Sequence, residues 1–175
     1  KKADLIIMGM KGAGKNLKKI FGSTASSLIS GIELPVLIVP EGAAFNYPDA
    51  IAFASDGIGS ALNEDLYKLK EIRDAFNAKL YVVHVVKNDD EEQLKFYELS
   101  TMENFYYVSF AFPVDADTGH ALDAFIQKHN VKLLVMMPHK HAWAERLFKS
   151  SETKEMIFHT HIPLLILADM FAYKN

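Results

Sequence analysis

The sequence contains no cysteine, which excludes disulfide scaffolds, thiolate zinc sites and cysteine nucleophiles. It has no apolar run near the ~20 residues of a membrane-spanning helix, and no segment reads as a signal peptide. Basic residues are not clustered, and 19 Lys and Arg against 22 Asp and Glu give a net charge of −3. Nucleic-acid binding needs a basic patch, so we expect a cytoplasmic protein without nucleic-acid or membrane partners.

What is present is a large supply of apolar side chains. Half of the 175 residues are hydrophobic and 11% are aromatic, enough to build a core and to exclude general disorder. The length predicts one domain, or one and a fraction. Because the chain opens on Lys1 and Lys2 without an initiator methionine, we expect it to be a piece of a longer protein.

Short apolar runs alternate with helical patterns along the chain. The runs have the composition of parallel strands buried on both faces, and between them apolar residues recur at spacings of three and four, as in Leu62 to Phe76 and Ala121 to Ile126. This alternation predicts an α/β fold, a doubly wound parallel sheet. The predicted strands are 5–8, 35–39, 51–54, 80–86, 106–112, 133–137 and 163–167.

One segment occurs twice. Residues 3–39, moved by 128 positions, align without a gap on 131–167, matching Leu5 with Leu133, Met8 with Met136 and Leu37 with Leu165. Only the second copy is preceded by further predicted strands. We therefore expect residues 1–42 to be a partial strand-helix-strand copy, the end of a first domain. A linker at 43–48 and a complete second domain at 49–169, with a five-stranded parallel sheet, would follow.

A glycine-rich loop follows the first predicted strand. Gly9 and Gly12 would let the backbone turn sharply and approach a ligand. Gly22, Ser23 and Thr24 would begin a helix, whose free N–H groups and hydroxyls favour a phosphate. A glycine turn and a serine-capped helix with a solvated basic face would explain the same residues.

The spacing G-x2-G-x9-G-S resembles the ATP-binding signature of the universal stress protein family. The resemblance implies an adenine nucleotide alpha hydrolase-like sheet of five parallel strands in the order 3-2-1-4-5. It also implies a regulatory protein that binds ATP, with contacts to the triphosphate and ribose. The residues carried over from the signature are Met8, Gly9, Gly12, Gly22, Ser23 and Thr24.

The second copy departs from this signature. Met137, Lys140 and Ser150 replace its three glycines, and Pro138 removes an N–H donor. Asp56, which in the family contacts adenine or ribose, is retained in the second domain. The sequence therefore predicts that the first loop alone binds phosphate and that the second is degenerate. Because the intact loop lacks its own adenine pocket, the ATP site of this chain is expected to be incomplete.

Other motifs in the sequence give weaker support to other kinds of functional site. The stretch Gly9 to Asn16 resembles a Walker A loop, but Asn16 stands where a Ser or Thr would bind magnesium. The pairs His139/His141 and His159/His161 lie at opposite ends of a helix of roughly ten residues, ~15 Å long, so we expect no metal site. His84, in an apolar strand, is predicted to be a hydrogen-bonded core residue. With no placed base, no catalytic residue is predicted, although weak nucleotide hydrolysis stays open.

Two functions remain: an ATP-binding regulatory protein, and a nucleotide-free scaffold of the same fold. In the resembled family the fifth strand is a sheet edge that pairs with another domain. This chain carries two such strands, Val36 to Val39 and Leu164 to Leu167, and antiparallel pairing between them within the chain would cover both edges. We also expect a homodimer through strand 5 edges.

Overall fold

The computed structural model describes residues 3–9, 34–44, 46–55, 60–91, 108–137 and 161–167. They fall into two compact units, one containing Lys1–Ala44 and Val135–Asn175 and the other Phe45–Leu134. The strands are β1 (Ile6–Gly9), β2 (Val36–Val39), β3 (Ala50–Ala54), β4 (Lys79–Val83), β5 (Val108–Ala111), β6 (Leu133–Met136) and β7 (Leu164–Ile166), and the helices are α2 (Ser60–Ala75) and α4 (Thr118–Lys128).

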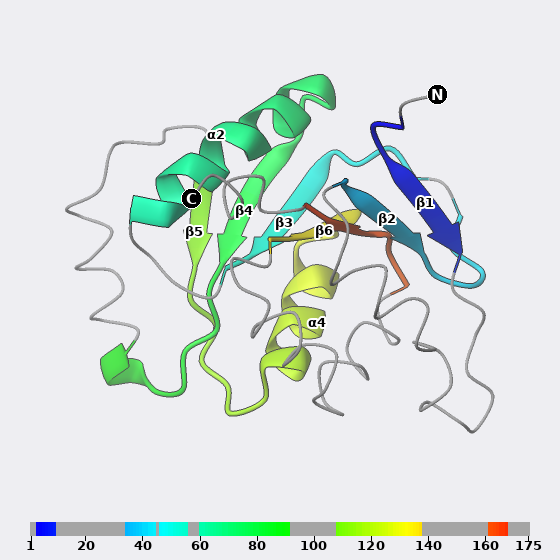
Figure 1. Ribbon diagram of the computed structural model, residues 1–175. Helices are drawn as coiled ribbons and strands as arrows, with labels where there is room; N and C mark the ends of the chain where they lie inside the picture. Colours follow the sequence, from blue (N-terminus) through cyan, green and yellow to red (C-terminus); the bar gives the residue numbers. More distant parts are fainter. Residues whose placement is uncertain are drawn as a thin grey trace. The chain divides into compact units, whose positions relative to one another are not determined.

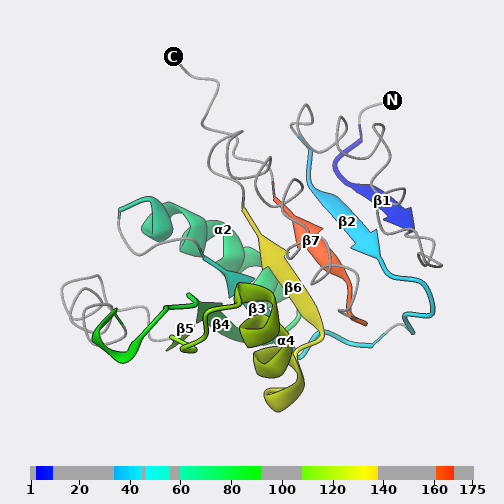
Figure 2. The same cartoon turned by 90° about the horizontal axis from the view of Figure 1, so that it is seen from below.

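The unit Phe45–Leu134 is built on parallel strands. β3 pairs with β4, and β4 with β5, all in parallel. A helix follows β3 and another follows β5, and Figure 2 shows α2 and α4 on opposite sides of β3 and β4. The described strands therefore form the predicted α/β sheet of mostly parallel strands.

Two helices of this unit end in the same way. Asn77 and Asn130 adopt left-handed backbone angles, with φ of 46° and 52°, a conformation that asparagine tolerates better than most residues. The next residue then bonds back five positions: the Ala78 N–H donates to the Arg73 carbonyl and the Val131 N–H to the Ile126 carbonyl. Ala78 and Val131 are buried, so each turn delivers the chain directly into the following strand.

The core of this unit comes from apolar residues at the predicted positions. Leu66 and Leu69 of α2 are almost fully buried, as are Ile51 and Phe53 of β3. Within the predicted run 80–86, Leu80, Val82, Val83 and Val86 are buried, whereas Tyr81, His84 and Val85 are half-buried. The strand itself ends at Val83, and Val86 rejoins the sheet through a parallel bridge to Val114.

The other unit joins the two copies of the repeat. β1 lies parallel to β2 (Figure 1), and β2 pairs with β7 in the antiparallel direction. The predicted antiparallel pairing of the two fifth strands within the chain is thus confirmed. β2 has a strand on each side, β1 and β7. The homodimer through strand 5 edges stays a prediction, and it would have to compete with the pairing of β2 and β7.

Candidate functional site

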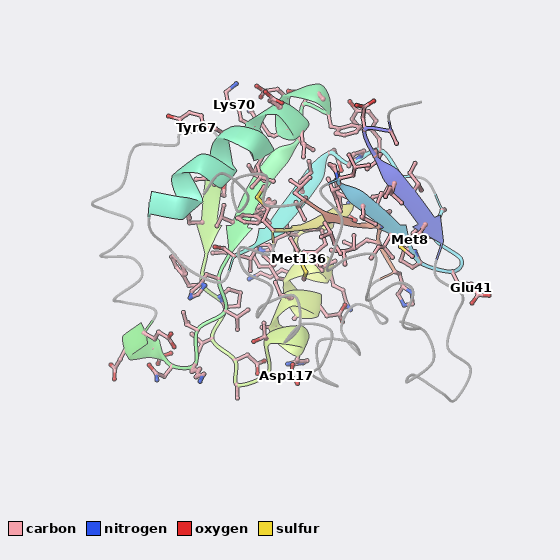
Figure 3. The ribbon with its side chains drawn as sticks, viewed as in Figure 1. Met8, Glu41, Tyr67, Lys70, Asp117 and Met136 are labelled. Carbon is pink, nitrogen blue, oxygen red and sulfur yellow. The ribbon has the colours of Figure 1, made fainter. Side chains whose placement is uncertain are left out.

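The described part of the glycine loop is its start. Met8 and Gly9 end β1, with Gly9 opposite Val39 of β2 (Figure 3 labels Met8). Gly9 is exposed, and a Cβ built on it meets no atom of the described residues within 4 Å. Its φ is not in the left-handed region. Neither packing nor backbone geometry therefore requires glycine here, and the space beside the backbone is open to a ligand.

The other residues of the predicted site lie outside the described residues. They are Gly12, Gly22, Ser23 and Thr24 of the loop, and Asp56, Pro138, Lys140 and Ser150 of the second domain. All contacts of the triphosphate, including those at Met8 and Gly9, therefore stay predictions.

The second copy differs at the position that matches Gly9. There the chain carries Met137, whose side chain is 3% exposed, directly after Met136, which is 2% exposed. A buried methionine side chain occupies volume that a bare glycine leaves open. This burial supports the prediction that the second loop is closed to a phosphate at its first position.

At the carboxyl ends of the parallel strands, His84 connects three strands. Its backbone N–H donates to the Ala111 carbonyl, at the end of β5, over 3.0 Å. Its Nδ1 lies 2.9 Å from the carbonyl oxygen of Ser55, which follows β3. Because a carbonyl can only accept, Nδ1 carries the proton and donates. The prediction that His84 is hydrogen-bonded is confirmed, whereas its predicted place in the core is wrong, because the residue follows β4 and is half-buried.

An aromatic contact completes the surroundings of this histidine. The ring of Phe112 lies edge-on to it, with centroids 6.4 Å apart. Further along the unit, Phe125 of α4 stacks on His129 with centroids 4.2 Å apart, and both contact Tyr81 of β4. These rings pack α4 against the sheet, which is a structural role and requires no ligand.

The sequence analysis did not single out a polar cluster at the start of α4. Asp117, labelled in Figure 3, is the N-cap, and its Oδ1 accepts from the His120 N–H over 2.9 Å. Asp115 accepts from the Asp117 N–H at Oδ1, over 2.9 Å, and lies 2.7 Å from His120 Nδ1 at Oδ2. Aspartate three residues before a helical N–H is a sequence signal for a cap and could have found it.

The charges of this cluster reinforce one another. The hydrogen bond from the Asp117 backbone, then the one with His120, lowers the pKa of Asp115 below its ordinary value. The hydrogen bond to Asp115 and its negative charge raise the pKa of His120. His120 is exposed and Asp115 is half-buried, and both bond at the start of α4, so the arrangement is a helix cap.

Metal binding has no support in the described residues. Of the four histidines in the two predicted pairs, only His161 is described, and it is exposed. Within the described ranges, no group of three or more His, Cys, Asp or Glu side chains is placed to hold a metal ion. The same ranges contain no helix long and apolar enough to cross a membrane.

Residues 1–40 match the model of the universal stress protein family, which confirms the resemblance over the segment that carries the glycine signature. A comparison with curated proteins gave no match.

Solved structures show the same fold. A universal stress protein from Archaeoglobus fulgidus DSM 4304 aligns with a TM-score of 0.67 and 17% identity, over 94% of this chain and 60% of the other. A putative universal stress protein from Pseudomonas aeruginosa UCBPP-PA14 aligns with a TM-score of 0.62 and 14% identity, over 94% of this chain and 63% of the other. This chain therefore spans about three fifths of the length of these structures.

Proposed function

We propose that this chain is a regulatory, non-enzymatic protein of the universal stress protein type that binds ATP through its first glycine loop alone. The observation that carries the proposal is the contrast between two matched strand ends. Gly9 leaves open space at the end of β1, whereas Met137 is buried at the same position of the second copy. The family match over residues 1–40 covers the whole loop.

The chemistry expected of the loop follows from two features: a glycine backbone without side chains, and the N-terminus of the helix expected after it. At Gly9 a phosphate could approach the main chain without meeting a side chain, as glycine permits. Gly12, Gly22, Ser23 and Thr24 would supply N–H groups and hydroxyls to phosphate oxygens, with the positive end of a helix dipole behind them. The residues described at Met8 and Gly9 fit such a ligand, and none of them offers a base for hydrolysis.

A titration with a fluorescent ATP analogue tests this proposal. Gly9→Val is the informative variant because the added side chain meets open space, so the fold should be kept while the close approach is blocked. We expect binding about tenfold weaker or worse, since a lost charge-assisted hydrogen bond is worth ~1.5–3 kcal/mol, and an unchanged melting temperature without nucleotide. Gly12→Val should abolish binding.

Lys140→Ala is the matched control in the second copy, and it should bind as the wild type does. Equal losses in the Gly9 and Lys140 variants would contradict the assignment to the first loop. No binding by the wild-type chain, even at millimolar nucleotide, would favour the second candidate, a nucleotide-free scaffold of the same fold. The buried Met137 in the second copy is the observation that favours this candidate.

A further inference from the structure

We draw no further inference here: the strongest candidate, the side-chain pair of Asp115 and His120 beside the N-cap of α4, belongs to the helix cap already described, and no second observation among the described residues points to a ligand there.

Discussion

Leu37 of β2 lies directly opposite Leu165 of β7, and the two are also the same position of the repeat. Their neighbours follow the same rule. Val36 pairs with Ile166, which is the repeat counterpart of Ile38. Ile38 pairs with Leu164, which is the repeat counterpart of Val36. The two copies thus join around a local two-fold axis at the Leu37–Leu165 pair, as the interface of a symmetric dimer does.

This pairing predicts a specific coupling between positions 37 and 165. Leu37→Lys and Leu165→Glu should each destabilise the fold. The double variant should recover part of the loss, since directly opposed cross-strand pairs contribute ~0.2–1 kcal/mol. Urea unfolding of the four proteins measures the coupling. Leu37→Lys with Leu165→Lys is the control and should be less stable than the two single changes predict.

The repeat also provides a matched test of burial at Met8 and Met136, both labelled in Figure 3. Met136 is 2% exposed, whereas Met8 is half-buried. Truncating a buried methionine costs ~2–5 kcal/mol. We therefore expect Met136→Ala to lose stability in this range and Met8→Ala to lose clearly less, both measured without nucleotide. Equal losses would mean that β1 is as well covered as β6.

Much of this fold could be predicted because burial determines both residue type and spacing. Parallel strands covered on both faces must be apolar throughout, so a continuous apolar run such as Leu133 to Met137 predicts a buried strand. The residues at which the strands end were harder to predict. The apolar run continues to Val86, yet β4 ends at Val83. The next residue, His84, bonds to the Ser55 carbonyl, and composition carries no record of that bond.

Some features of the candidate site could likewise be predicted from the sequence, and others could not. The glycine spacing predicts a ligand loop after β1, because a backbone that must approach a ligand excludes side chains, and this loop stays a prediction beyond the open space at Gly9. The cap formed by Asp115, Asp117 and His120 was missed, because polar residues are ordinary both before a helix and in its first turn, where these three lie. Its meaning lies in short-range hydrogen bonds. The exposure of Leu5, which precedes β1, and of Ile7 within it could not be predicted either, since their counterparts Leu133 and Val135 are also apolar and yet are buried.

His84 should stabilise the carboxyl ends of the strands through its hydrogen bond to the Ser55 carbonyl. His84→Leu removes the donor, and the loss of this hydrogen bond should cost about 0.5–1.5 kcal/mol. His84→Asn is the control, because its side-chain amide can place a donor near the position of Nδ1. A melting temperature for His84→Asn close to that of the wild type, with a clear loss for His84→Leu, would confirm a structural role. Equal losses would argue against the bond.

Asp117 should hold the first turn of α4. Replacing an aspartate N-cap with alanine costs ~0.5–2 kcal/mol, because the His120 N–H then loses its acceptor. We expect Asp117→Ala to lower the unfolding midpoint in urea and Asp117→Ser, which keeps an accepting oxygen, to lower it much less. Hydrogen exchange at the first turn of α4 should accelerate in the alanine variant alone. If serine were as harmful as alanine, the side-chain bond would not be the cause.

The pair formed by His120 and Asp115 should make stability depend on pH within a defined window. The pKa of His120 is raised above 6.5 by its hydrogen bond to Asp115, so its contribution is full below this value and is lost as pH rises through the folded pKa. The pKa of Asp115 is lowered below 3.8, first by the hydrogen bond from the Asp117 backbone. Its contribution is therefore full above 3.8 and is lost as pH falls through the folded pKa.

The two limits leave a window between about pH 4 and pH 6.5. In that window the melting temperature of the wild type should exceed that of Asp115→Asn by its largest margin, and the margin should shrink on both sides. It should be small, because both groups are open to solvent. Nuclear magnetic resonance titration of the His120 ring gives the direct measurement: the substitution should return its pKa toward the ordinary histidine value. An unchanged His120 titration in Asp115→Asn would show that the carboxylate does not hold the proton on the ring.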